Sequence, residues 1–297
     1  MLKYRADLRT LGYIIITTAL FFYQWKYGTN WWLYTTFLFF EVAVSVITHN
    51  HNHLSIWNWQ PLNILTDWWL TIFYGAPVFA WIPTHNRNHH RFVNTDGDTS
   101  LTYRKSEENN LLTVLSYPSM SGFYQVTQSV IPYMKDLRVK DRAKFIENWV
   151  QIFVLVIWVA TFLILDWKRA LFLVVLPQQV SAFSVFVFNY LQHVHADEES
   201  KYNHSRNFMG VNWFLFNNGF HTMHHERASI HWSELPQAHK KIEHLIAPHL
   251  IEPSFWWYIF RTYILSIFVP KYRSNSMRLE RMKTTPVTSN VASAHGV

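Results

Sequence analysis

Histidine is the residue in this chain whose number and spacing most clearly predict chemistry. The 297 residues include 17 histidines, and none of them lies in residues 1–48 or 91–192. Imidazole nitrogens are common ligands of transition metals, so clustered histidines indicate a metal centre. Four clusters are present: His49-Asn-His51-Asn-His53, His85-Asn-Arg-Asn-His89-His90, Asn189-Tyr-Leu-Gln-His193-Val-His195 and His221-Thr-Met-His224-His225.

Helical spacing indicates which of these side chains can meet at a metal. Residues three or four apart share a helix face, whereas residues two apart do not. His49 is therefore expected to converge with His53, and His85 with His89, while His51 points away. The three histidines of the fourth cluster form a set on one turn. The expected donors are nine imidazoles and one amide: His49, His53, His85, His89, His90, His193, His221, His224, His225 and Asn189.

Nine imidazoles exceed the four ligands that a tetrahedral zinc site takes. They would suit two metals of five or six coordinates, and all-imidazole ligation favours iron, copper or zinc. The absence of cysteine excludes disulfides, thiolate zinc sites, iron–sulfur clusters and cysteine nucleophiles. Eight histidines are expected to be ordinary residues: His51, His195, His204, His231, His239, His244, His249 and His295. Of these, His195 and His204 are the nearest to spare ligands.

Apolar runs predict the elements that must position these ligands. Mean hydropathy is −0.04, but this value averages a polar part with four runs about long enough for membrane helices. Short connectors at 26–30 and 166–169 predict two tight hairpins. We therefore expect an all-α membrane protein with four transmembrane helices, at about 11–25, 31–48, 148–165 and 170–192.

This topology predicts a single domain over 1–270, in which a helical cap, residues 49–147 and 193–270, holds a di-metal site. The polar tail, 271–297, is expected to be disordered. Of 26 basic residues, 23 would lie on the side of the cap, so the positive-inside rule places the histidines and both termini in the cytoplasm. The expected location is the inner or plasma membrane. The basic surplus then reflects topology, and nucleic-acid binding is not expected.

Three further stretches, 54–84, 110–134 and 253–270, are apolar but interrupted by Pro, Gly or charge, and we expect them to be interfacial or re-entrant. Glu41 lies within the second expected span, two turns before His49. A carboxylate at that depth is costly and suggests a function, although it could equally snorkel or pair with a neighbouring helix.

The boxes HNHNH, HNRNHH and HTMHH resemble those of the membrane fatty-acid desaturase and hydroxylase superfamily. NYLQHVH is similar to the segment that leaves the fourth span of that family with one further ligand, and the resemblance covers about 11–270. It implies a non-haem di-iron centre with O2 as co-substrate, held by the nine histidines named above. Asn189 matches a position that in some members reaches the metal through a water molecule.

Two features depart from the family's commonest pattern. The second box has three residues between its first two histidines, where many acyl-lipid desaturases have two; the longer spacing also occurs among hydroxylases. No fused cytochrome b5 or ferredoxin segment is present. Electrons are therefore expected from a separate carrier, such as a ferredoxin or cytochrome b5.

An unactivated methylene has neither an acidic proton nor a leaving group, so the metals must carry the chemistry and no separate acid or base is assigned. The first hypothesis is an O2-dependent lipid desaturase, with the apolar helix faces lining a tunnel for the acyl chain. The second is a hydroxylase or ketolase of alkyl or carotenoid chains. A His-rich metal transporter or a haem-binding subunit is the third. Asp98, and after it Asn94 and Asp96, could hold the outward N–H groups of the second box.

Overall fold

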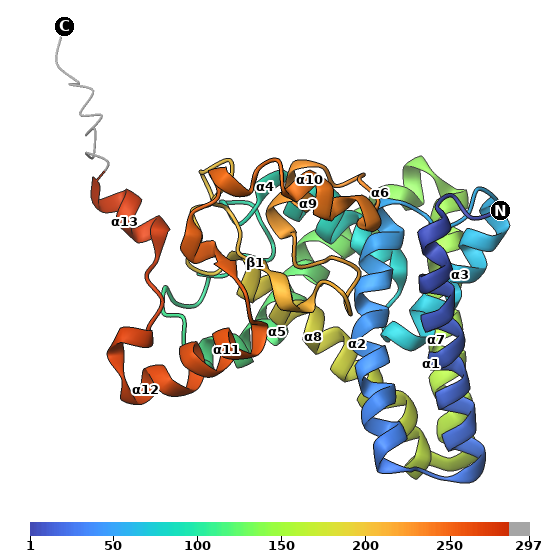
Figure 1. Ribbon diagram of the computed structural model, residues 1–297. Helices are drawn as coiled ribbons and strands as arrows, with labels where there is room; N and C mark the ends of the chain where they lie inside the picture. The colour runs from blue at the N-terminus through green and yellow to red at the C-terminus, as the bar shows by residue number, and fades with distance from the viewer. Residues whose placement is uncertain (285–297) are drawn as a thin grey trace, which may run out of the picture.

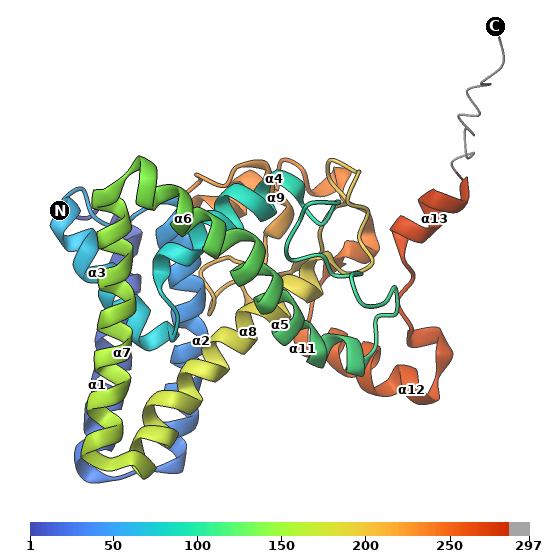
Figure 2. The same ribbon diagram turned by 180° about the vertical axis from the view of Figure 1, so that it is seen from behind.

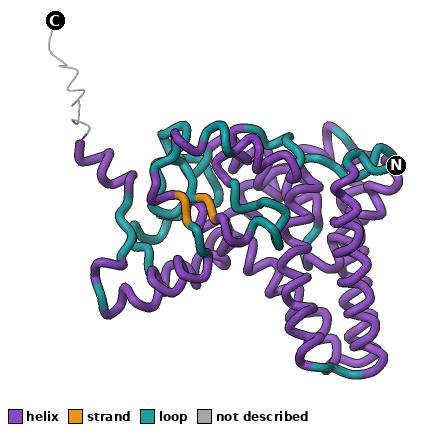
Figure 3. The backbone as a smooth tube through the Cα atoms, in the orientation of Figure 1, coloured by secondary structure: helices purple, strands orange, loops and turns teal. Residues whose placement is uncertain are grey.

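The computed structural model describes residues 1–284 and is mostly helical, with one pair of two-residue strands among the described residues (Figure 3). Long helices run together toward one end of the molecule, and shorter helices and loops form a broad cap at the other (Figures 1 and 2). Both chain turns between the long helices lie at the end opposite the cap. The cap ends of the long helices therefore all lie on the same side of the molecule.

The first hairpin consists of α1, Leu8–Tyr27, and α2, Trp31–His53. Gly28 makes the turn with φ +95°, a value that residues with a Cβ rarely adopt. Asn30 begins α2, because its side chain accepts hydrogen bonds from the N–H groups of Trp32 and Leu33 at 3.0 and 3.2 Å. α2 thus continues beyond its apolar run and carries the first histidine cluster.

The second hairpin consists of α7, Arg142–Ala170, the π-helical turn η5, Leu171–Val175, and α8, Leu176–His193. The chain reverses at Asp166, which has non-helical angles of φ −161° and ψ 96°. Arg169 ties this reversal to the first hairpin by donating to the carbonyl of Trp25 at 2.7 Å. From there α8 rises obliquely into the cap (Figure 2), where it ends at the third histidine cluster.

Two described helical stretches are long and apolar enough to cross a membrane, Trp31–His53 and the 52-residue path Arg142–His193. α1 is not one of them. The four-span topology and the cytoplasmic cap therefore remain predictions. Large apolar side chains nevertheless stay exposed along the long helices, as a hydrocarbon environment would allow; examples are Ile15, Phe22, Phe153, Ile157, Ile164 and Leu165.

The cap is built from short elements that precede α7 or follow α8 in the sequence. Between α2 and α7 lie α3, Gln60–Tyr74; η2, Val78–Ala80; η3, Ile82–His89; α4, His90–Phe92; α5, Leu111–Gln125; η4, Val126–Val130; and α6, Ile131–Lys140. After α8 come β1, Asn207–Phe208; η6, Met209–Val211; α9, His221–Glu226; η7, Trp232–Glu234; α10, Leu235–His239; η8, Glu243–Leu245; η9, Pro248–Leu250; β2, Ile251–Glu252; α11, Phe255–Ile259; η10, Phe260–Leu265; α12, Ser266–Phe268; and η11, Pro270–Tyr272. A short 3-10 turn, η1 (Arg5–Asp7), precedes α1.

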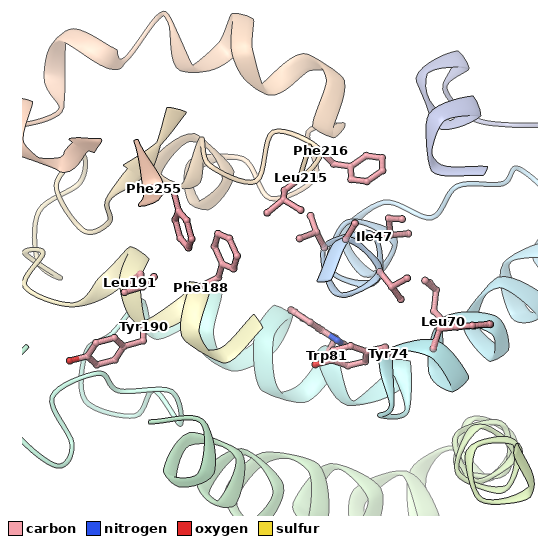
Figure 4. Close-up of a cluster of buried hydrophobic side chains, with 14 of the residues drawn as sticks. Ile47, Leu70, Tyr74, Trp81, Phe188, Tyr190, Leu191, Leu215, Phe216 and Phe255 are labelled. Atoms are coloured by element: carbon pink, nitrogen blue, oxygen red, sulfur yellow. The ribbon is translucent and has the colours of Figure 1, made fainter. Parts of the chain in front are cut away.

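A continuous apolar cluster joins the cap to the long helices. Figure 4 shows Ile47 of α2 and Leu70 of α3 near Tyr74 and Trp81, with Phe188 of α8 facing Phe255 of α11. The last two rings stack at 4.9 Å between centroids. Because each ring contributes a large buried area, these contacts fix the helices that carry the histidine clusters.

Glu41 lies inside this junction and is 1% exposed. Its backbone carbonyl accepts a hydrogen bond from Ser181 of α8 at 2.7 Å, whereas its carboxylate Oε2 has no hydrogen-bond partner. The side chain is buried in the helix junction, so it does not snorkel, and Oε2 makes no pair with a neighbouring helix.

The first part of the tail, which was expected to be disordered, contains a helix. Met277–Thr284 forms α13, which Arg278 ties to Glu107 and Arg281 to Asp197 and Glu198. These ion pairs join segments far apart in the sequence, which is why composition alone did not predict the helix. Residues 285–297 of the expected disordered tail lie outside the described residues.

Candidate metal centre

Five histidines form a first group, in which all ligand atoms lie within 4.8 Å of one another: His49, His53, His85, His90 and His224. Four of their Nε2 atoms make a closed ring. The successive distances are 3.0 Å from His49 to His85, 3.1 Å to His90, 3.1 Å to His224 and 3.0 Å back to His49. A neutral nitrogen either donates or accepts here, so at most two of these contacts can be hydrogen bonds.

The ring has the size that a bound cation requires. Imidazole nitrogens about 2.1 Å from an ion lie about 3.0 Å apart at right angles, and about 3.4 Å apart in a tetrahedron. The distances of 3.0 and 3.1 Å thus fit the right-angled arrangement. The ring of His53 lies 4.7 to 5.1 Å from the other four ring centroids, and its Nε2 has no hydrogen-bond partner. This donor set fits five-coordinate ligation.

Four histidines form a second group beside the first: His89, His193, His221 and His225. Their Nε2 atoms follow one another at 3.1, 2.9 and 3.1 Å, again the right-angled spacing. The ring centroids of His90 and His225, one from each group, are 4.5 Å apart. All nine histidines expected from the sequence therefore lie together, divided five and four.

The division differs from the one predicted for the second and fourth clusters. His85 does not share a group with His89; it shares one with His90, because η3 is a π-helical turn. There the backbone N–H of His90 bonds to the carbonyl of His85, so residues five apart align. In α9 likewise, His221 and His225 join the second group and His224 the first. The three are not a single ligand set.

Polar partners orient the outward nitrogens of the second group. Oδ2 of Asp98 lies 2.8 Å from Nδ1 of His89, and the carboxylate is fully buried. It also accepts from the backbone N–H and hydroxyl of Ser100 and from the N–H of Asn94. Asn94 therefore acts through Asp98 and not on a histidine, and Asp96 is exposed. Nδ1 of His193 donates to the carbonyl of His204 at 3.0 Å.

Burial favours the neutral form of several of these imidazoles. Burial, and then the charges of neighbouring histidines, lower the pKa of His90 to about 2. The same two causes lower the pKa values of His224 and His225 well below their ordinary value. Burial raises the pKa of Asp98, but His89 and the hydrogen bonds of Ser100 outweigh it and hold that pKa well below its usual range. Neutral lone pairs beside one buried carboxylate are a donor set suited to cations.

We expect Asp98→Asn to weaken metal binding by about 10- to 100-fold, because a histidine ligand loses the anion that orients it. The measurement is metal retained by the purified protein against increasing chelator. Asp96→Asn is the matched control, since Asp96 is exposed two residues away. Equal metal retention in the two variants would contradict this role for Asp98.

Asn189 is linked to the second group through a chain of hydrogen bonds. Its amide donates to the hydroxyl of Tyr117 at 2.7 Å, and that hydroxyl donates to the carbonyl of Ser100 at 2.6 Å. Ser100 in turn lies 3.0 Å from Nδ1 of His89. The role of Tyr117 and Ser100 was not predicted, since neither residue type nor spacing sets them apart in the sequence.

The seven described histidines that were expected to be ordinary take no part in either group. His51 lies 3.3 Å from Asp67 and accepts from the N–H of Ile56. His195 contacts the carbonyl of Glu107 at 2.8 Å. His204 packs its ring against that of His225, with 5.3 Å between centroids. Four others lie elsewhere in the cap: His231, His239, His244 and His249. His295 lies outside the described residues.

A sequence model of the family described as "Fatty acid desaturase" matches residues 14–270. The chain belongs to the fatty acid desaturase family. No curated protein and no solved structure matches it. Membership of the desaturase family implies a lipid substrate and suggests an oxidoreductase. Together with the two apolar helical stretches, it also suggests a membrane protein.

Proposed function

We propose that the protein is an O2-dependent desaturase that introduces a C=C bond into an unactivated fatty-acyl chain. The observation that carries this proposal is a cavity of about 310 Å³ whose wall includes histidines of both groups. His49 and His85 come from the first group, and His89 and His221 from the second. A chain in this cavity would lie beside both groups at once.

The rest of the cavity suits a hydrocarbon. Most of its wall is apolar, and it is lined by Phe186 and Phe188 of α8 together with Val126 and Val130 of η4. Two further polar residues, Asn189 and Gln192, line the cavity with the histidines. The apolar side chains can bind and align an acyl chain and exclude water, which a reaction at an inert methylene requires.

The nine histidines and their partners support iron as the metal. Two iron ions, when bound, would supply the activation of O2 that no side chain of this protein can provide. His49, His53, His85, His90 and His224 would hold one ion. His89, His193, His221 and His225 would hold the other, with Asn189 near it through a water molecule.

The proposal includes the predicted topology. Four spans would place the cap, the histidines and both termini in the cytoplasm, where a separate ferredoxin or cytochrome b5 could deliver electrons. The basic residues support this orientation, since 23 of 26 would lie on one side.

Lipid analysis tests this function. Cells that express the protein and are supplied with defined fatty acids should gain an alkene with no oxygenated product, and the purified protein should hold about two irons per chain. A hydroxylated or ketonic product without alkene would favour the hydroxylase or ketolase. Zinc alone, or haem absorbance, would reject the enzyme in favour of a transporter or haem subunit.

Gly122 provides a matched pair of variants for the same experiment. It lines the cavity, and a Cβ there would lie 3.6 Å from the ring of Phe186, an ordinary contact. Gly122→Ala should therefore leave the alkene yield nearly unchanged. Gly122→Phe should fill the cavity and lower the yield at least about tenfold with iron retained. An unchanged yield would contradict this location for the acyl chain.

A further inference from the structure

A second large cavity, of about 400 Å³, lies on another side of the cap. It is formed between Glu252 of β2, the α11–η10 helix and the segment from Lys271 to Glu280. None of the nine histidines of the two groups lines it. Whatever it binds is therefore separate from the metal centre. We refer to it as the basic cavity.

Charge distinguishes this cavity from the acyl cavity. Four basic side chains line it, Arg206, Arg261, Lys271 and Arg273, against two acidic ones, Glu252 and Glu280. Arg261 holds Glu252 with two hydrogen bonds, at 2.9 and 2.5 Å. That carboxylate is thus already satisfied and cannot neutralise the other cations fully.

Arg206 is a buried cation that donates from one nitrogen to the carbonyls of Leu191 and Val194, at 3.0 and 3.1 Å, and forms only a long ion pair with Glu252. It is 3% exposed and lies over the ring of Tyr258 at 4.7 Å. Its Nε has no hydrogen-bond partner and is 3.9 Å from the nearest oxygen of Glu252. Lys271 and Arg273 are exposed at the rim and form no ion pair among the described residues. An anion in the basic cavity would offset this excess of positive charge.

The wall of the cavity is also an amphipathic helix with an unusual outer side. Phe255, Tyr258, Thr262 and Tyr263 are buried, while the outer side is apolar and 40 to 76% exposed. We refer to that outer side as the aromatic face: Trp256, Trp257, Phe260, Ile264, Ile267 and Phe268.

The position of the aromatic face fits the surface of a bilayer. Both views place α11 beside α5, away from the α1–α2 hairpin (Figures 1 and 2). Aromatic residues with basic neighbours are typical of helices that lie among lipid headgroups. Phosphate is the anionic group found at that depth.

We propose that the basic cavity binds the phosphate of an anionic membrane phospholipid, whose acyl chains lie against the aromatic face. Lys271 and Arg273 meet the phosphate at the rim, and Arg206 supports it from within. The site does not depend on the reaction at the histidine groups.

Lipid binding to the purified full-length protein in detergent micelles tests the proposal, with native mass spectrometry as the readout. Phosphatidylglycerol should bind at least tenfold more tightly than phosphatidylcholine. Lys271→Gln combined with Arg273→Gln should weaken phosphatidylglycerol binding about thirtyfold, the factor expected for two cations near a membrane surface. Phosphatidylcholine binding should not change.

Lys240→Gln combined with Lys241→Gln is the matched control, because both lysines are exposed and lie outside the cavity. It should bind phosphatidylglycerol like the wild type. Inorganic phosphate and glycerol phosphate, added as competitors, distinguish the source of the phosphate group. Full displacement of the lipid by either soluble ion would overturn the proposal, and so would equal phosphatidylglycerol binding in the two double variants.

Discussion

His224→Ala is expected to reduce the metal content from about two ions per chain to one or fewer and to abolish alkene formation. His224 is one corner of the Nε2 ring, 3.0 Å from His49 and 3.1 Å from His90. Substitution of residues that only orient a ligand already costs about 10- to 100-fold, so loss of a ligand should cost more. Elemental analysis and lipid profiling measure the two effects.

His51→Gln is the sharpest control for this experiment. His51 lies between two donors of the first group, yet its own contacts are Asp67 and the N–H of Ile56. Its replacement should lower stability somewhat and leave the metal content unchanged. If both variants lost metal equally, the loss would reflect unfolding; if neither did, the proposed ligand set would be wrong.

Gly219→Ala is expected to destabilise the protein by at least about 3 kcal/mol. A Cβ at Gly219 would lie 1.9 Å from the carbonyl oxygen of Phe208, a backbone atom that cannot move aside alone. Gly219 and Phe208 are also joined by a 3.0 Å hydrogen bond. The substitution therefore separates β1 from the start of α9, which carries three of the nine histidines.

The measurement is the thermal midpoint of the purified protein together with its metal content. Gly12→Ala is the comparison, because a Cβ at Gly12 meets nothing within 4 Å and alanine favours a helix. That variant should be as stable as the wild type or slightly more so. A Gly219→Ala protein with normal metal content and an unchanged midpoint would show that β1 does not set the position of α9.

The sequence predicted which histidines lie together better than how they are arranged. Apolar runs and short connectors identified the four long helices, because length and hydropathy are local properties. The histidines could be found for the same reason, as each cluster lies within a few residues. The division into groups of five and four could not, since it depends on the backbone of η3 and on where α9 begins.

Contacts between segments far apart in the sequence also could not be predicted. α13 is held by ion pairs from Arg278 and Arg281 to acidic residues more than 80 positions earlier. The link from Asn189 through Tyr117 to Ser100 likewise joins three separate segments. Asp98 was easier to identify, because a carboxylate nine residues after a histidine in a turn is a local pattern.

The π-helical turn at η3 changes how the spacing of the second box is understood. In H-x-x-H-H, the first and last histidines are four apart, as one turn of an α-helix requires; here they are five apart, as one π turn requires. The wider turn absorbs the additional residue and still brings His85 and His90 to 3.1 Å. A one-residue insertion in this box therefore need not change the ligand sphere. In this chain the length of the second box reflects the local winding of the backbone, so it gives no reason to choose between the two reaction products.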